Sequence, residues 1–191
     1  GVDIDVPGIG IDFLVSSANK CVQGVPGFSY IICKRSALAA CEGKSRSVSL
    51  DLYDQWKTME KDGKWRFTSP TQSVVAFAKA LEELEEEGGI PAREKRYREN
   101  NQELIRRMKA LGIRTYVDEA HQGPIITTVF YPEGKKFSFD EMYHYIKDRG
   151  YAIYPGKLTD ADTFRIGNIG EIYMDDIDKV CDILETFLKE H

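Results

Sequence analysis

The chain has 191 residues, of which 42% are hydrophobic and 30% are charged, and its formal net charge is −5. This composition is that of a globular chain with ample material for a core, and it excludes a disordered tail, a collagen-like chain and a disulfide miniprotein. No apolar run reaches the roughly 18 residues of a membrane helix, and the acidic balance without a Lys/Arg stripe argues against nucleic acid, so we expect neither as a partner.

The first predicted elements are two strands joined by a short loop. An apolar run at residues 11–15 predicts a buried strand that ends in a loop of small residues. Two glycines and a proline at 23–27 give a turn signal, and residues 28–34 predict a second strand. The connection is too short for a crossover helix, so the strands form an antiparallel pair or a strand switch.

Helices dominate the middle of the chain. One or two helical turns are expected at 36–41, followed by a long functional loop at 43–66. The next helix has Pro70 near its first position, an apolar face over 74–84, and a glycine pair after it. A second long helix is predicted over about 91–111, with an apolar stripe formed by Leu104, Ile105, Met108 and Leu111.

The remainder alternates between strands and helices. The predicted elements are a strand at 126–131, a helix at 138–150 with Ser138 as N-cap and Glu141 at the capping-box position, short and longer strands at 151–156 and 163–170, and a terminal helix at 173–191. These elements predict a sheet of three or four strands covered by helices.

The pattern as a whole predicts an α/β chain with two parts. Residues 1–95 are expected to form the C-terminal part of a larger domain, and residues 96–191 a small α+β domain. The chain begins with neither an initiator Met nor a signal peptide, so we expect it to start inside a fold.

The four cysteines are Cys21, Cys33, Cys41 and Cys181. They show neither CxxC spacing nor a nearby histidine pair, so the sequence predicts no metal site and no redox pair. We expect free, buried thiols, which are typical of a protein in the reducing cytoplasm.

Lys20 is the first candidate catalytic residue. It directly follows the first predicted strand and lies beside Ser17, Ala18 and Asn19. A lysine held at a strand end inside a cleft is poorly solvated, so its pKa falls and its neutral amine can attack a carbonyl carbon. Such a lysine is nevertheless more often a solvated surface residue, and this position alone does not decide between the two interpretations.

Three longer strings favour the catalytic interpretation. They are SSANKCVQGVPGF at 16–28, WRFTSPTQSVVAFAKAL at 65–81 and YPGKLTDADTFRIGNIG at 154–170. In this order they resemble the class V aminotransferases of fold type I, which use pyridoxal 5'-phosphate. The resemblance runs over essentially the whole chain but covers only the C-terminal half of such an enzyme. It implies the end of the large cofactor-binding domain followed by the small C-terminal domain.

The resemblance also implies roles for individual residues. Lys20 matches the lysine that binds the cofactor covalently and moves the proton during transamination, and Ser17 and Asn19 are expected near the cofactor phosphate. Arg165 matches the arginine that binds the acidic end of the substrate, whereas without the resemblance a structural salt bridge would be the simpler interpretation. Thr68 matches a threonine that reaches the phosphate in the neighbouring subunit, and an N-cap role is compatible with this.

The string SANKCVQGVPG favours one reaction within the family, the transfer of the amino group of 2-aminoethylphosphonate to pyruvate, which gives phosphonoacetaldehyde and alanine. Alternatives are an alanine–glyoxylate or serine–pyruvate aminotransferase, and an inactive C-terminal fragment that folds and self-associates. The family implies a homodimer with shared active sites. The groups that stack on the pyridine ring, pair with its nitrogen and form the main phosphate cradle lie in the family's N-terminal half, outside these residues.

Overall fold

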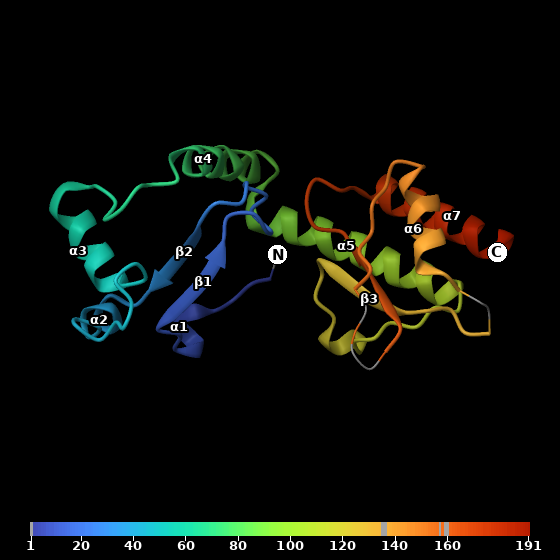
Figure 1. Cartoon of the computed structure of the whole chain (residues 1–191), viewed down its shortest axis with the longest axis horizontal. Coiled ribbons are helices and arrows are strands. Elements are labelled where there is room, and N and C mark those ends of the chain that lie inside the picture. The colour runs from blue at the N-terminus through green and yellow to red at the C-terminus, as the bar shows by residue number, and fades with distance from the viewer. Residues whose placement is uncertain (1, 135–136, 157, 159–160) are drawn as a thin grey trace. The chain divides into compact units, whose positions relative to one another are not determined.

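The computed structural model describes residues 2–134, 137–156, 158 and 161–191 (Figure 1). Its contacts divide it into two compact units, one of Asp3–Glu83 and one of Leu84–His191 together with Val2. Among the described residues, each unit contains one two-stranded antiparallel sheet with its own helices. This division falls within helix α4, and the boundary predicted near residue 95 stays a prediction.

The first unit is built on strands β1 (Phe13–Ser17) and β2 (Ser29–Cys33). The two strands run antiparallel, so the predicted antiparallel pair is confirmed. The predicted first strand ends two residues too early, at residue 15, because Ser16 and Ser17 also pair with β2. The prediction of a buried strand is wrong for this unit, since Val15 is 64% exposed and Ile32 is 56% exposed.

Four helices accompany this sheet, namely α1 (Val6–Ile9), α2 (Arg35–Ala39), α3 (Leu52–Asp62) and α4 (Thr71–Glu86). The prediction of a long loop at 43–66 is wrong for the residues of α3, which form a helix. The Asp51 side chain caps α3 by accepting a backbone hydrogen bond at 3.1 Å, and Gly63 ends it with a φ of 72°. Two aromatic residues of this segment lie one turn apart on α3, with the ring centroids of Tyr53 and Trp56 5.8 Å apart.

The second unit contains the longest helix of the chain and a second antiparallel pair. Its elements are α5 (Gly89–Ala110), a short 3-10 helix η1 (Glu119–His121), β3 (Ile126–Phe130), α6 (Phe139–Lys147), β4 (Thr163–Gly167) and α7 (Met174–Glu190). The predicted Ser138 cap is confirmed, because its hydroxyl accepts the backbone N–H of Glu141 at 3.3 Å. No helix in the described ranges is long and apolar enough to cross a membrane.

The sheet of this unit is smaller than predicted. Single bridges flank the β3–β4 pair, Thr115 with Val129 on one side and Tyr154 with Arg165 on the other. The strand expected at 151–156 is therefore one bridge long within the described residues. Pro155 follows the bridge directly and lacks the N–H that a longer ladder would need.

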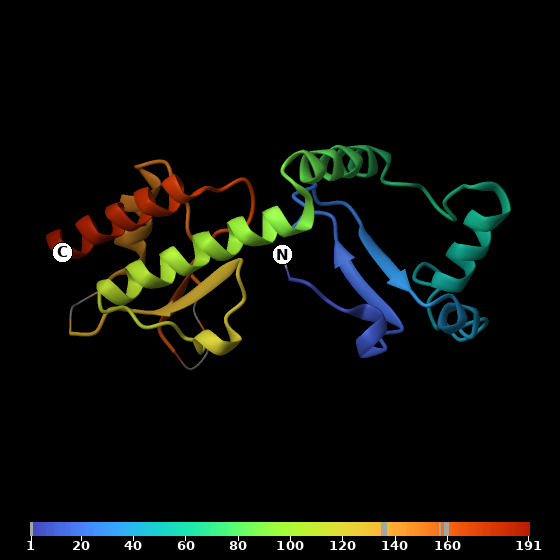
Figure 2. The same ribbon diagram turned by 180° about the vertical axis from the view of Figure 1, so that it is seen from behind.

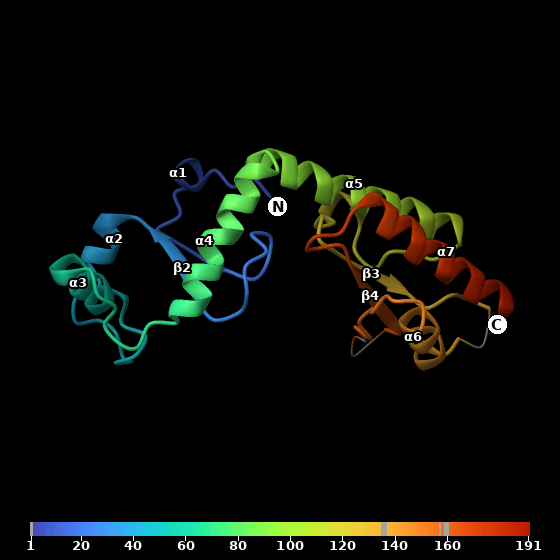
Figure 3. The ribbon, with the colours of Figure 1, turned by 90° about the horizontal axis from the view of Figure 1, so that it is seen from above.

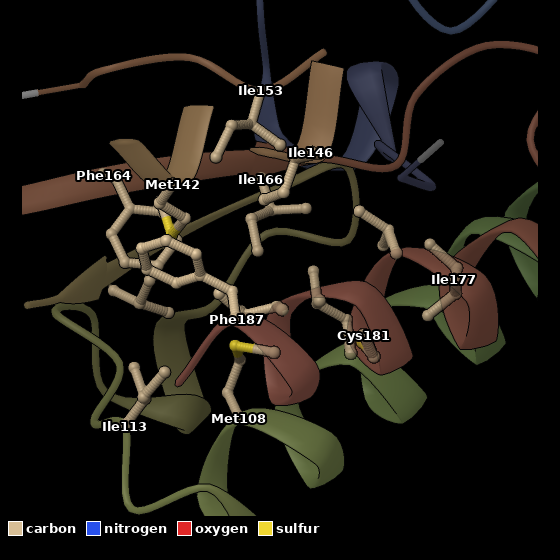
Figure 4. Close-up of a cluster of buried hydrophobic side chains, with 14 residues drawn as sticks. Met108, Ile113, Met142, Ile146, Ile153, Phe164, Ile166, Ile177, Cys181 and Phe187 are labelled. Atoms are coloured by element: carbon tan, nitrogen blue, oxygen red, sulfur yellow. The ribbon is translucent and has the colours of Figure 1, made fainter. Parts of the chain in front are cut away.

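Apolar side chains from α5, α6, α7 and both strands form one core (Figure 4). Figure 4 shows Met108 of α5, Phe164 of β4 and Phe187 of α7 in this cluster. Helices α5 and α7 lie side by side in Figures 1 and 3, and Figure 2 shows α5 in front of β3, which it contacts. The predicted stripe of α5 is confirmed as a core face.

The four thiols are free, as predicted, but only Cys181 is fully buried. Desolvation in the α7 core raises the pKa of Cys181 to about 12. The other three, Cys21, Cys33 and Cys41, are partly exposed because they lie in the first unit, whose sheet faces are open.

The N-terminal half of the inward face of α5 is polar instead of apolar. Arg93 is only 5% exposed, and its guanidinium meets Glu87, whose carboxylate also accepts the Arg96 Nε at 2.7 Å. The hydrogen bond from Arg96, and then that from Arg93, lower the pKa of Glu87 below its ordinary value of 4.5. This carboxylate therefore neutralises two guanidinium groups where α5 begins.

We expect Glu87→Gln to destabilise the fold by about 1.5 to 3 kcal/mol at pH 7, because hydrogen bonds to two charged groups lose their ionic partner. The lowered pKa of Glu87 means that its contribution is complete above the ordinary carboxyl pKa and is lost as the pH falls through the folded-state pKa. Denaturant unfolding at several pH values should show a difference that shrinks in acid. Glu99→Gln is the control, because its pair with Lys95 is exposed.

Candidate functional site

Lys20 lies in the tight turn that connects β1 to β2. The turn is closed by two backbone hydrogen bonds, from Gly24 N to Ala18 O and from Gln23 N to Lys20 O, both of 2.8 Å. Ala18 at its base is fully buried, whereas Lys20 is exposed. The expected desolvation of this lysine is therefore not found in the described chain, because its own unit leaves the side chain open.

Close contact with α4 holds this turn in place. A Cβ added at Gly24 would lie 2.7 Å from Ala18 O and 3.2 Å from the ring of Phe77, so only glycine fits. The Phe77 ring also packs against Phe28 at a centroid distance of 5.3 Å and a near-perpendicular angle of 88°. The Ser73 hydroxyl adds a hydrogen bond of 3.2 Å to Pro26 O. The lysine turn is thus fixed to the first two turns of α4.

Three other predicted cofactor residues lie in the same unit. Ser17 is the last residue of β1, Asn19 directly precedes Lys20, and both are half-buried. Thr68 is exposed and lies three residues before α4. No hydrogen bond of the Thr68 hydroxyl to another described residue supports the N-cap alternative, whereas the Ser69 and Thr71 hydroxyls bond to each other at 2.8 Å.

Arg165 lies in the second unit, in the middle of β4. Its backbone is held on both sides, by the pairing with Thr128 and by hydrogen bonds of 3.0 and 3.2 Å with Tyr154. The stem of its side chain lies against Gly156, where an added Cβ would come within 2.4 Å of Arg165 Cγ. No carboxylate among the described residues pairs with this guanidinium, so the structural salt bridge considered above is not found there.

The described site residues thus form two groups. Ser17, Asn19, Lys20 and Thr68 belong to the first unit, where Ser17 ends β1 and Asn19 and Lys20 lie in the turn after it, and Arg165 belongs to the other unit. Sequence reasoning missed that Phe77 anchors the lysine turn and that Gly156 makes room for the arginine stem; the only signals were a helical aromatic and a Pro-Gly pair. Among the described residues, no three His, Cys, Asp or Glu side chains are placed to hold a metal ion.

The chain matches one protein family and many curated relatives. Residues 1–165 match the family described as aminotransferase class-V. A 2-aminoethylphosphonate–pyruvate transaminase of Lysinibacillus sphaericus is 56% identical over 188 residues, which are 98% of this chain and 51% of that protein. A relative of the same name from Salmonella schwarzengrund is 52% identical over 97% of this chain and 51% of its own length. The chain therefore spans about half the length of these curated relatives.

Solved structures show the same fold at low sequence identity. A pyridoxamine–pyruvate aminotransferase from Mesorhizobium loti has a TM-score of 0.86 and 18% identity over all of this chain and 50% of that one. A ureidoglycine–glyoxylate aminotransferase from Bacillus subtilis has a TM-score of 0.83 and 22% identity over 100% of this chain and 50% of its own. At such identities the likeness establishes the α/β fold and nothing finer.

The packing at Gly24 gives a direct structural prediction. Gly24→Ala should destabilise the protein by about 1 to 3 kcal/mol, because the new methyl group clashes with a backbone oxygen that cannot move without opening the turn. The control is Gly123→Ala, which has no heavy atom within 4 Å of its added Cβ and should be neutral or slightly stabilising. Thermal unfolding of both variants measures the difference, and equal midpoints would contradict the close packing.

Proposed function

This chain belongs to the class V aminotransferases, and on that premise we propose that it is half of a pyridoxal-phosphate enzyme. The proposed reaction transfers the amino group of 2-aminoethylphosphonate to pyruvate and yields phosphonoacetaldehyde and alanine. Relatives named for this reaction are 52% to 56% identical to this chain over 97% to 98% of its residues. The observation that carries the proposal is that this region contains both an exposed lysine in a turn closed by backbone hydrogen bonds and an arginine without a carboxylate partner among the described residues.

The same proposal divides the chain into functional parts. Residues 1–95 supply the C-terminal part of the fold type I cofactor domain, including the lysine turn, and residues 96–191 supply the small C-terminal α+β domain with the arginine. In support, the lysine turn and α4 pack together in one compact unit, and β4 and its helices form the core of the other.

The chemistry of the turn fits pyridoxal 5'-phosphate. Lys20 offers a primary amine that makes no hydrogen bond or ion pair with the described residues, so it is free to bond to the aldehyde carbon. Small, half-buried Ser17 and Asn19 leave room for the phosphate. When bound, the cofactor withdraws electrons from the amine-bearing carbon of the substrate and so weakens its C–H bond. The Lys20 amine, released from the aldehyde carbon when the substrate amine takes its place, would move that proton between the substrate carbon and the cofactor carbon.

Arg165 is the proposed anion-binding residue. A planar guanidinium presents two parallel N–H donors, which match either the phosphonate of the amino donor or the carboxylate of pyruvate. Its backbone is fixed by β3 and by Tyr154, so the charge is held by a strand and not by a loop. The same guanidinium therefore binds the acidic group of each substrate in turn and orients the reacting carbon toward the cofactor.

We further infer that the complete enzyme is a cytoplasmic homodimer with shared active sites. Thr68 is the residue proposed to reach the phosphate in the neighbouring subunit, and its exposure just before α4 leaves the hydroxyl open to such a contact. The four free thiols support a reducing compartment. The other partners are the two small substrates.

Two alternatives remain distinct from this proposal. An alanine–glyoxylate aminotransferase from Nostoc shares the fold but is only 21% identical over the aligned residues, whereas the relatives at 52% to 56% identity favour the phosphonate donor. An inactive fragment is favoured by the half-length coverage, since the pyridine-binding groups of the family lie outside these residues. The visible absorbance of the purified chain with added cofactor tests whether the chain by itself binds it.

Lys20→Ala in the full-length protein should reduce turnover by several powers of ten, because proton transfer by a positioned base alone contributes about 10² to 10⁴. The fold should persist, since the Lys20 side chain is exposed. Lys34→Ala is the matched control; this lysine follows the partner strand, and within the described residues it pairs with exposed Asp12. Steady-state transamination rates and circular dichroism measure the two effects, and an active Lys20→Ala enzyme would overturn the assignment.

Arg165→Lys keeps the charge but loses the two-pronged geometry, so it should weaken both substrates. Charged hydrogen bonds contribute roughly 1.5 to 3 kcal/mol, and each half-reaction should therefore lose about 10- to 100-fold in kcat/KM. Arg114→Lys, an exposed arginine paired with Glu133 in the same unit, is the control. Single-turnover kinetics of each half-reaction give the answer; normal values for both substrates would place the anion site elsewhere.

A further inference from the structure

A fully buried asparagine follows the arginine on the same stretch of chain. Asn168 is 0% exposed and lies three residues after Arg165, immediately beyond β4. Its Nδ2 donates to Pro124 O at 2.7 Å and to Tyr97 O at 3.1 Å, and its backbone N–H donates to Ile125 O at 3.0 Å. One side chain thus joins the end of β4 to α5 and to the segment that leads into β3.

The orientation of this carboxamide is fixed by its partners. Both nearby groups are carbonyl oxygens, so the atom that faces them must be the NH₂ donor. The Oδ1 of Asn168 is buried and accepts no hydrogen bond from any described residue. A buried acceptor without a partner opposes folding, so stability alone does not explain an asparagine at this position.

Polar side chains of α5 hold the segment that follows Asn168. Arg96 donates from Nη1 to Gly170 O at 2.8 Å and to Ile172 O at 2.9 Å, and Asn100 donates to the same Ile172 O at 2.8 Å. The Arg96 guanidinium also lies about 5 Å from the ring centroids of Tyr97 and Tyr173. We call Arg96, Tyr97, Asn100 and Asn168 the clasp.

We propose that Asn168 is a positioning residue for Arg165, and that the clasp fixes the direction in which the guanidinium reaches the substrate anion. This inference rests on the proposed function. The backbone of Arg165 is held at its sides by Thr128 and Tyr154, and in the described structure the hydrogen bonds that join the carboxyl end of β4 and the segment after it to α5 come from the clasp. A small rotation of β4 is amplified along the arginine side chain, and a displacement of about 1 Å can cost about 100-fold in rate.

The test is a double-mutant cycle in the full-length holoenzyme. Asn168→Asp keeps the shape of the side chain but replaces the donor that faces two carbonyl oxygens. The first readout is kcat/KM for 2-aminoethylphosphonate and for pyruvate, which we expect to fall about 10- to 100-fold. The second is the single-turnover rate with propylamine, an amine without an acidic group, which should stay within about twofold. The third repeats these measurements in an Arg165→Ala background, where Asn168→Asp should add no more than about twofold.

Two further variants separate positioning from loss of stability. Leu184→Ala, in the buried face of α7, lowers stability through a cavity remote from the clasp, and its ratio of phosphonate to propylamine activity should stay normal. If Asn168→Asp does not fold, Asn168→Ser keeps one donor and takes its place in the cycle.

Each outcome decides the inference. An equal loss with propylamine and with 2-aminoethylphosphonate would reduce Asn168 to a structural residue, and so would an undiminished effect in the Arg165→Ala background. Normal kinetics of Asn168→Asp with all three compounds would also overturn the proposed role. If Arg165→Ala by itself leaves both acidic substrates unaffected, the proposed anion site has failed, and the inference fails with it.

Discussion

The close approach of the lysine turn to α4 is the constraint on which the first unit depends. Because residue 24 has no side chain, the turn can close on Ala18 O while Phe77 packs against it. The hairpin, the lysine and the helix that follows Thr68 are thereby held as one body. On the proposal that Lys20 is the catalytic amine, a turn fixed at its base returns this amine to the same position in every cycle while leaving it exposed.

In the second unit, the strand that contains Arg165 is positioned by one helix, α5, whose buried face is polar in its N-terminal half and apolar in its C-terminal half. The C-terminal half of α5 buries apolar side chains such as Leu104 and Met108 in a core shared with α7. Its N-terminal half buries guanidinium and carboxamide groups, which are satisfied by Glu87 and by backbone carbonyls after β4. Apolar packing gives this unit its stability, whereas the directional hydrogen bonds determine where the strand with Arg165 ends.

Local signals in the sequence predicted most elements, and long-range contacts explain the failures. The β1–β2 pair, α4 to α7 and the Ser138 cap followed from periodicity, caps and glycines. Helix α3 was missed although Asp51 and Gly63 mark its ends, because residues 43–66 were interpreted as one long loop. The resemblance identified Lys20 and Arg165 as candidates, but no local pattern joins Asn168 to Tyr97, which lies 71 residues away. The solvation of Lys20 and of β1 was also misjudged, since burial depends on which segments cover a strand, not on the strand itself.

The central claim is that Lys20 is the residue that holds the cofactor. The most direct measurement is borohydride reduction of the full-length protein after loading with pyridoxal 5'-phosphate, followed by peptide mass mapping. Reduction makes the bond to the cofactor permanent, so the peptide that contains Lys20 should carry the added mass, and substitution of Lys20 should abolish the label. Stoichiometric labelling of another lysine, such as Lys34, or a protein that holds the cofactor without any labelled lysine, would contradict the claim.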